Sequence, residues 1–335
     1  MSDLERVTPS RGRGGALLAV GIASSVFFVW LVFRDADLDA VWAALSSADV
    51  GLVAMAAAVI QIVYVAQGAR WRIIAATLEL TVKRFYALVL GGIGANNILP
   101  LRIGDLLRAR WLAKSAAIPS GRAFGSVFRD RACDVLTLVI ALAVSLPVVG
   151  DPAWVNRIAL GGTALVAVLA LAIGGAVVYS RKRPRARRES RTRARQLLRD
   201  TVDEVASPIG RRRLALALGL SVIAWGAWAV TAGLISRSLG FSLSPIELVF
   251  VTAVINLGVV IPSSPGFIGT YQWLAVSALG VVGIDGEVAI AFSLLMQSIW
   301  FIPTTIAGGV IAVREINRDA RRPSVEGEPP VPSPG

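Results

Sequence analysis

The chain of 335 residues is 55% hydrophobic and 17% charged, with a formal net charge of +12 at pH 7. Soluble domains carry about 25% charged residues, so this composition excludes a soluble globular protein. The sequence has no histidine and one cysteine, Cys133, which excludes histidine-assisted catalysis, Cys/His metal sites and an intramolecular disulfide; neither a metal nor a cofactor is expected.

Long apolar runs determine the predicted fold, because several of them reach the roughly 18 residues that cross a bilayer. The predicted full spans are 15–33, 50–69, 132–149, 158–179, 214–236 and 288–313. Two further apolar regions, at 85–114 and 246–283, are interrupted by Pro, Gly and polar residues. We therefore expect an all-α polytopic membrane protein with about six full spans and two broken, re-entrant hairpins, or about eight spans if the second hairpin crosses fully.

The distribution of charge divides the chain into parts. Residues 181–213 hold thirteen Lys or Arg and four Asp or Glu. A basic run can indicate nucleic-acid binding, but beside membrane spans it indicates a cytoplasmic loop near anionic lipid, so no nucleic-acid partner is expected. The predicted parts are a cytoplasmic N-terminal segment (1–14), a first transmembrane half (15–180), the basic cytoplasmic loop (181–213), a second transmembrane half (214–313) and a disordered cytoplasmic tail (314–335).

Charge also predicts the topology. The loops 34–48 and 284–287 carry more acid than base, so the positive-inside rule places both termini in the cytoplasm. Residues 70–84 and 102–131 are both basic, yet one apolar run separates them. A single crossing there would put one basic segment outside, so we expect this run to enter from the cytoplasm and turn back at Pro100.

The 246–283 region is either a matching hairpin or two full spans. An internal repeat supports the hairpin, because an offset of 162 residues gives seven identities over positions 94–117, among them Pro100 with Pro262 and Gly104 with Gly266. The same offset relates the spans 50–69 and 132–149 to later spans that cross in the opposite sense. This pattern predicts an inverted-repeat, transporter-like core.

The first broken region carries charge close to its break. Arg102, Asp105 and Arg108 are i,i+3 neighbours on a helix that begins after Pro100, so one helix face alternates in charge. A guanidinium binds two phosphate oxygens at once, and charge at membrane depth marks a ligand path. The alternative is that these side chains reach lipid headgroups at the cytoplasmic surface.

A second charged motif begins the span that runs to about residue 150. Asp130 and Asp134 are one helical turn apart, and Arg131 can reach Asp134. The alternative is an interfacial anchor cluster, which is the interpretation given to Arg129. Asp134 lies one turn deeper, where an unpaired carboxylate is unfavourable by about 2.5 kcal/mol or more, so Arg102 or Arg131 is its expected partner.

A third motif, at 262–272, breaks one helix and restarts another. The new helix exposes backbone N–H donors, and Ser263 and Ser264 could cap it or donate to a phosphate. The alternative is a kinked loop at the membrane surface. The break or gate residues in the two hairpins are Pro100, Gly104, Pro262, Pro265, Gly266 and Gly269.

Isolated polar residues in the spans have more ordinary interpretations. The amides Gln61, Gln67, Asn256 and Gln297 are predicted to form hydrogen bonds between helices. The segment 70–72, Arg-Trp-Arg, is predicted to anchor a helix at the membrane interface.

Three segments, 97–108, 130–134 and 262–272, carry a family resemblance. They read NILPLRIGDLLR, DRACD and PSSPGFIGTYQ. In this order and spacing they resemble the flippase-like integral membrane family related to the transmembrane region of lysylphosphatidylglycerol synthases, bacterial proteins that make aminoacylated phosphatidylglycerol and flip it. The resemblance covers about residues 15–315 and implies a lipid-translocating membrane protein.

The chain departs from the family pattern at three positions. Asp105 and Asp130 stand where the family usually has glutamate, which keeps the charge. Gln272 stands where the family usually has a carboxylate, so a proton-coupling role is not carried over to it. No segment of these residues corresponds to the soluble aminoacyl-transferase domain of the full synthases, so synthase activity is not expected.

The sequence therefore favours a translocase of the cytoplasmic membrane that moves a phosphate-bearing lipid, such as an aminoacylated phospholipid or a polyprenyl-phosphate-linked lipid. The expected partners are thus membrane lipids. Arg102, Arg108 and Arg131 would bind the phosphate, while Asp105 and Asp134 would orient them or bind a cationic headgroup. The candidate substrate-binding residues are Asn96, Asn97, Arg102, Asp105, Arg108, Asp130, Arg131, Asp134, Ser263, Ser264 and Gln272.

Two alternatives stay open. In the first, the chain is a membrane enzyme or a non-catalytic subunit of a lipid- or glycolipid-modifying enzyme, although a nucleophile–base pair is missing from the motifs. Otherwise it is a scaffold whose basic loop, 181–213, binds a partner.

Overall fold

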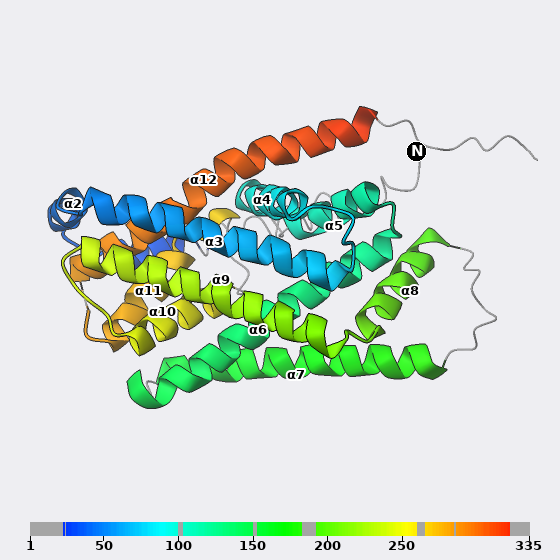
Figure 1. The fold of residues 1–335 in the computed structure, drawn as a ribbon. Coiled ribbons are helices and arrows are strands. Elements are labelled where there is room, and N and C mark those ends of the chain that lie inside the picture. Colours follow the sequence, from blue (N-terminus) through cyan, green and yellow to red (C-terminus); the bar gives the residue numbers. More distant parts are fainter. Residues whose placement is uncertain are drawn as a thin grey trace, which may run out of the picture.

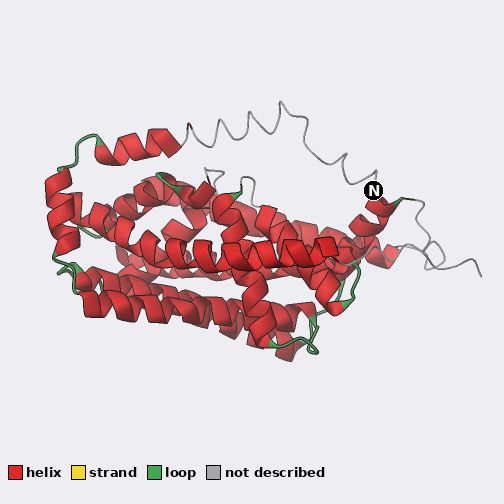
Figure 2. Cartoon of the chain, turned by 90° about the horizontal axis from the view of Figure 1, so that it is seen from above, coloured by secondary structure: helices red, strands yellow, loops and turns green. Residues whose placement is uncertain are grey.

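The computed structural model describes residues 23, 25–99, 103–149, 153–182, 192–259, 265–284 and 286–321, and within them it is helical without strands (Figures 1 and 2). Residues 25–33 form a helix that precedes the labelled ones. The elements are α2 (Leu38–Ser46), α3 (Val50–Ala75), α4 (Val82–Ile98), α5 (Ile103–Ala116), α6 (Ser120–Val149), α7 (Ala153–Lys182), α8 (Arg193–Ala206), α9 (Arg211–Ser238), α10 (Pro245–Gly258), the 3-10 turn η3 (Pro265–Phe267), α11 (Thr270–Val281) and α12 (Gly286–Arg321).

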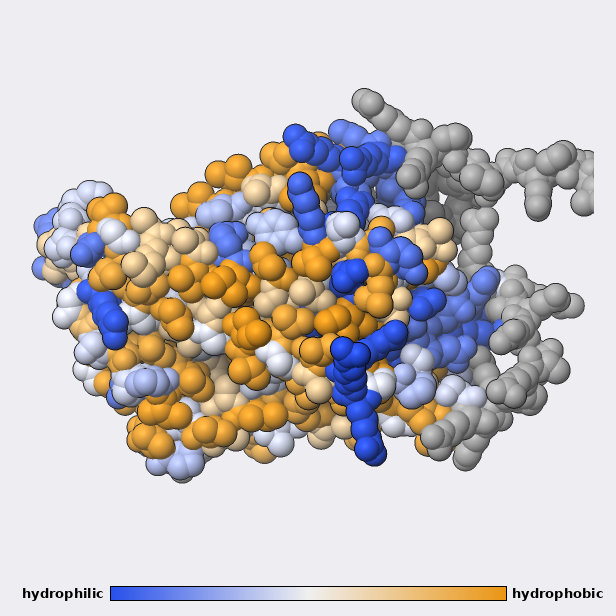
Figure 3. All heavy atoms as spheres, in the orientation of Figure 1, coloured by the Kyte–Doolittle hydropathy of each residue, from blue (hydrophilic) through white to orange (hydrophobic). Residues whose placement is uncertain are grey.

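Long apolar helices confirm the polytopic class. Within the described residues, five helices are long and apolar enough to cross a membrane: α3, α6, α9, and the parts of α7 and α12 at Leu160–Ser180 and Gly286–Asp319. They coincide with five of the six predicted spans; of the remaining one, 15–33, residues 15–22 and 24 lie outside the described part and 25–33 are helical. Large apolar side chains on these helices face outward, as Leu171 does at 74% exposed, and hydrophobic residues cover the middle of the visible face (Figure 3). A bilayer is the environment that such a surface fits.

The two broken regions are pairs of short helices. α4 and α5 are 17 and 14 residues long, and α10 and α11 are 14 and 12, all below the roughly 20 residues of a full span. α4 ends at Ile98, the next residue, Leu99, is in extended backbone, and α5 begins at Ile103. Between α10 and α11 the chain turns through Gly266 and Gly269 at φ of 72° and 84°. Each pair packs as a helical hairpin; the predicted break residues Pro100 and Pro262 lie outside the described residues.

The predicted basic loop contains a helix, which corrects that assignment. α8 spans fourteen of its residues and packs against α6 and α7. The close approach is permitted by Gly121 and Gly125, since a Cβ at Gly125 would lie 2.7 Å from the Glu204 side chain. The sequence reading missed α8 because abundant arginine obscured its apolar positions, of which Val205 is buried.

The predicted disordered tail, 314–335, begins too early, because the last helix extends into it. α12 continues to Arg321, so residues 314–321 are helical. Two acidic side chains hold this extension on the first hairpin: Glu315 pairs with Arg84 at 2.6 Å, and Asp319 pairs with Lys114 at 2.8 Å. Residues 322–335 lie outside the described part.

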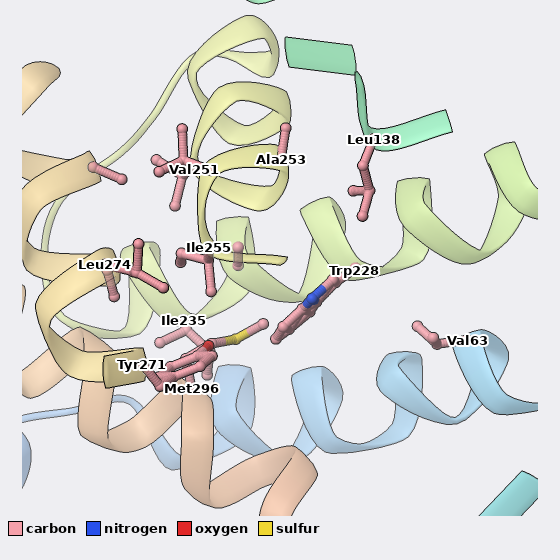
Figure 4. Close-up of a cluster of buried hydrophobic side chains, with 14 of the residues drawn as sticks. Val63, Leu138, Trp228, Ile235, Val251, Ala253, Ile255, Tyr271, Leu274 and Met296 are labelled. Atoms are coloured by element: carbon pink, nitrogen blue, oxygen red, sulfur yellow. The ribbon is translucent and has the colours of Figure 1, made fainter. Parts of the chain in front are cut away.

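The halves of the chain correspond at the predicted offset. Shifted by 162, α3 falls on 212–237, α4 on 244–260 and α6 on 282–311, close to α9, α10 and α12. α3 and α9 run antiparallel, since the Asp49 amide at the start of α3 donates to the Ser238 carbonyl at the end of α9, at 3.0 Å. The first helix of each hairpin packs on a long helix of the other half, and these two long helices correspond at the offset: α4 packs on α12 and α10 on α6. The main core draws on both halves, with Val63 and Leu138 from the first and Trp228, Tyr271 and Met296 from the second (Figure 4).

Glycine makes the α4–α12 crossing close. A Cβ at Gly94 would meet the backbone of Gly308, and a Cβ at Gly308 would overlap the Leu90 carbonyl oxygen. The neighbouring Gly309 is different, because its Cβ would make an ordinary contact of 3.6 Å with Ile98. Small residues of this kind let helices approach in lipid, where burial alone gives little drive for association.

We predict opposite effects for the two adjacent glycines. Gly308→Ala should lower stability by about 1–3 kcal/mol through overpacking, whereas Gly309→Ala should be neutral or stabilising by up to about 1 kcal/mol, because alanine favours the helix. Heating detergent-solubilised protein and measuring the monodisperse fraction by size-exclusion chromatography distinguishes the two. Equal effects would contradict the crossing.

Candidate functional site

A buried guanidinium organises the candidate site. Arg70, near the end of α3, is 0% exposed. Its Nε lies 2.8 Å from Asp130 Oδ1, and its Nη1 lies 2.7 Å from Asp134 Oδ1, both on α6. Nη1 also donates to Ser221 Oγ on α9 at 2.9 Å, and Trp225 Nε1 donates to Asp134 at 3.1 Å. These contacts join α3, α6 and α9 in the interior.

The first hairpin joins the same network through α5. Arg108 Nη1 lies 3.3 Å from Asp130 Oδ2, and its Nε lies 3.0 Å from Asp105 Oδ1. The Arg108 guanidinium also stacks over the Trp71 ring at 4.7 Å from its centroid, a cation–π contact. Arg131 completes the set, with Nη2 at 2.8 Å from Asp105 and Nη1 at 3.3 Å from Asp134.

The network has no net charge, and its side chains range from fully buried to partly exposed. Three arginines face three aspartates, which offsets much of the cost of removing charges from water. The side chains of Arg70, Asp130 and Arg108 are at most 2% exposed. Asp105 and Arg131 are 22% and 39% exposed. The network therefore has a closed interior and one accessible ion pair at its rim.

That rim lies on the wall of a central cavity of about 180 Å³. Both halves of the chain contribute to the wall, and aromatic side chains make up much of it. Its residues are Ile60, Val63, Tyr64, Gln67, Ile93, Asn96, Asn97, Asp105, Arg131, Trp225, Trp228, Asn256, Val259, Phe267, Tyr271 and Trp300. The wall can contact an apolar or cationic group through its aromatic rings and an anion through the partly exposed Arg131. Within the described residues no group of His, Cys, Asp and Glu side chains is placed to hold a metal ion.

The structure brings together most of the charged residues singled out in the sequence. Asp105, Arg108, Asp130, Arg131 and Asp134 form one cluster, and two of the three expected i,i+3 pairs, Asp105–Arg108 and Arg131–Asp134, are confirmed. Arg102, Ser263 and Ser264 lie outside the described residues. A substrate-binding role stays a prediction for every candidate residue, described or not.

The two asparagines fix the first hairpin as well as lining the cavity. Asn96 Oδ1 accepts from the Gly104 amide at 2.7 Å, while Asn97 Nδ2 donates to Thr304 and Thr305 on α12 at 3.1 and 2.9 Å. A side chain at Gly104 would collide with the Gly92 carbonyl. This break position therefore requires glycine.

Gln272 has a structural position. It is 4% exposed, accepts from the Gly269 amide at 2.7 Å and hydrogen-bonds Gln297, and it is not among the cavity-wall residues. Gln297 in turn donates to the Gly266 carbonyl at 2.8 Å, so the interhelical role predicted for it is confirmed. The two amides fix the turn of the second hairpin.

Arg70 is the principal residue that the sequence reading missed. The prediction that 70–72 anchors a helix at the interface is wrong for Arg70 and Trp71, which are both 0% exposed. Arg129 was also interpreted as an interfacial anchor, but it is buried and bonds Glu204 of α8 at 3.0 Å. Burial raises the pKa of the Glu204 carboxyl, although Arg129 and Arg122 lower it. One feature of the sequence could have indicated such a residue. The segment 130–134 has two aspartates but one arginine, so a second arginine had to come from elsewhere in the chain.

Comparison with known proteins agrees with the geometry. The chain is similar to a protein named glycosyltransferase AglD from Haloferax volcanii, with 25% identity over 341 aligned positions that cover 90% of this chain and 54% of that protein. It thus spans about half the length of that relative. The sequence profile of the family described as the lysylphosphatidylglycerol synthase TM region matches residues 17–308, which is most of the chain. The chain belongs to this transmembrane family.

Proposed function

We propose that the protein moves a phosphate-bearing lipid between the leaflets of a membrane. The observation that carries this proposal is the Asp105–Arg131 pair, which is the accessible rim of a buried ionic network and faces a cavity between the two halves. Charge at this depth in a membrane protein marks a ligand path. An aminoacylated phospholipid or a polyprenyl-phosphate-linked lipid has the required chemistry.

The orientation in the cytoplasmic membrane is part of the proposal. Ion pairs place the start of α4, the end of α5 and the end of α12 together, through Arg84 with Glu315 and Arg110 with Asp319. α8 joins the same end through Arg122 and Glu204. This end holds many of the basic residues, so the positive-inside rule assigns it, with both termini, to the cytoplasm.

In this orientation the two hairpins are re-entrant and approach the cavity from opposite faces. α4 and α5 connect to helix ends on the basic side, whereas α10 and α11 connect to the ends of α9 and α12 on the other side (Figure 1). Two inverted halves around one central site are the arrangement that supports alternating access.

The rim pair supplies the binding step. A lipid phosphate entering the cavity competes with the Asp105 carboxylate for the Arg131 guanidinium, which can hold two oxygens at once. Asp134, which also pairs with the buried Arg70, keeps Arg131 in place. The cavity of about 180 Å³ is smaller than the roughly 300–1,000 Å³ of ligand pockets, so the hairpins have to move apart to admit a headgroup.

A second candidate is a membrane subunit of a lipid- or glycolipid-modifying enzyme. The matched relative is named as a glycosyltransferase and is about twice as long as the matched region. In that case the cavity would present a lipid to a partner enzyme, and the chain itself would not catalyse a reaction.

The rim is predicted to govern transport. Arg131→Gln and Asp105→Asn should each slow the inward movement of fluorescent phosphatidylglycerol in proteoliposomes by about tenfold or more, which corresponds to about 1.4 kcal/mol. Dithionite quenching of the outer leaflet measures this rate. Arg110→Gln is the matched control, because Arg110 is 52% exposed and pairs at the surface with Asp319.

Transport that is unchanged in both rim variants would contradict the proposed site. If wild-type protein moves phosphatidylglycerol, its lysyl derivative and a polyprenyl phosphate no faster than protein-free vesicles do, the enzyme-subunit interpretation is favoured.

The interior of the network is predicted to govern folding. Asp130→Asn leaves Arg70 and Arg108 buried with too little negative charge and should destabilise the protein by about 3–5 kcal/mol. Asp35→Asn should cost at most about 1 kcal/mol, because Asp35 is 82% exposed in its pair with Arg34. Thermal stability of the purified proteins tests this, and equal stability of the two variants would show that the interior pairs do not support the fold.

A further inference from the structure

A second cavity lies on the other side of α6. It has a volume of about 730 Å³, is bounded by α6, α7, α8 and α9, and is open on one side. Its wall is mostly apolar and includes Leu136, Ile173, Val177 and Leu218. α6 separates it from the charge network, because Cys133 and Leu136 line this cavity while Arg131 lines the central one.

Water is a poor occupant for this space. Apolar cavities stay dry unless polar groups converge in them, and the volume falls in the range of a ligand pocket. The adjacent α7 turns large apolar side chains outward, with Val168 60% and Leu171 74% exposed, so the cavity lies beside the bilayer. A lipid acyl chain is the apolar molecule available there.

Positive charge lies next to the cavity wall along the chain, while the wall itself includes Asp203. Arg211, Arg212 and Arg213 are exposed and begin α9, directly between the wall residues Ile209 and Leu214. The first turn of α9 also presents backbone N–H donors, since Gly210 has no side chain to cap them. Arg129 on the wall is already engaged by Glu204 and Ser207. The three arginines are therefore placed to bind an anionic headgroup whose chain enters the cavity.

We propose that this cavity holds one acyl chain of an anionic phospholipid, whose phosphate binds at residues 211–213. This lipid is resident and is distinct from the lipid that the central cavity would transport. It fills the space between α7 and α9 and completes the packing of α8 on α6. The proposal requires a membrane-embedded chain but not translocase activity, so it can fail or hold independently of the proposed function.

Cys133 offers a native reporter of occupancy. It is the single cysteine in the sequence and lies on the wall of this cavity. An acyl chain in the cavity should shield its thiol from a small alkylating reagent. No cysteine has to be introduced or removed for the measurement.

The test measures alkylation of Cys133 by N-ethylmaleimide, using intact mass, in delipidated full-length protein in detergent micelles. Adding dioleoyl phosphatidylglycerol should slow the reaction about tenfold or more, and dioleoyl phosphatidylcholine should slow it much less. Native mass spectrometry should find one phosphatidylglycerol retained per chain. Unfolded protein gives the reference rate for an unprotected thiol.

Variants separate the chain site from the headgroup site. Ile173→Trp and, as a second version, Val177→Trp should fill the cavity, protect Cys133 without lipid and abolish lipid retention. Replacing residues 211–213 with glutamine should remove the preference for phosphatidylglycerol, whereas replacing them with lysine should retain it. Arg237→Gln, an exposed arginine at the far end of α9, is the control and should behave as wild type.

Three results would overturn the proposal. The first is an alkylation rate that phosphatidylglycerol does not change in wild-type protein. The second is equal protection by phosphatidylcholine, which would show that the site does not select an anionic headgroup. The third is undiminished retention of phosphatidylglycerol in both tryptophan variants, when each elutes as folded, monodisperse protein.

Discussion

The fold depends on the neutralisation of a guanidinium that has no access to water. Arg70 is fully buried, and in a low-dielectric interior its charge is tolerable only with carboxylates in direct contact. Asp130 and Asp134 supply them from α6, and Ser221 adds a hydrogen bond from α9. Because lipid tails give helices little reason to associate, this polar contact fixes how three spans lie against one another.

The gradient of exposure across the network is what connects stability to function. A fully buried pair cannot bind a ligand without first being broken, at a cost of several kcal/mol. The pair of Asp105 and Arg131 is partly exposed on the cavity wall, so an anion can replace one partner while the interior pairs persist. One network thus contains a buried frame and a partly exposed contact, and α5 of the first hairpin contributes to both.

The physical origin of each signal explains what the sequence could predict. Spans were predictable because crossing a bilayer requires a long apolar run, and the Asp105–Arg108 pair was predictable because helical spacing is local. Arg70 was not, since its partners lie 60 and 64 positions away and tertiary pairing leaves no local pattern. α8 was hidden for another reason: its charge resembled that of a solvated loop, while its burial depends on glycines in α6.

The two halves share an architecture but not its chemistry. At the offset of 162 residues, every member of the charge network has a partner in the second half that is uncharged: Ala232, Phe267, Thr270, Phe292, Ser293 and Met296. Four of these are apolar residues that belong to the main core or pack against it, including Phe292 at 0% exposed. The second hairpin is held by the amides of Gln272 and Gln297 instead. In the proposed transport, a headgroup released by Arg131 would find no equivalent charge at the corresponding positions of the other half. Alternating access would then have to come from the hairpins moving around one fixed charged site, rather than from passing the lipid between two equivalent ones.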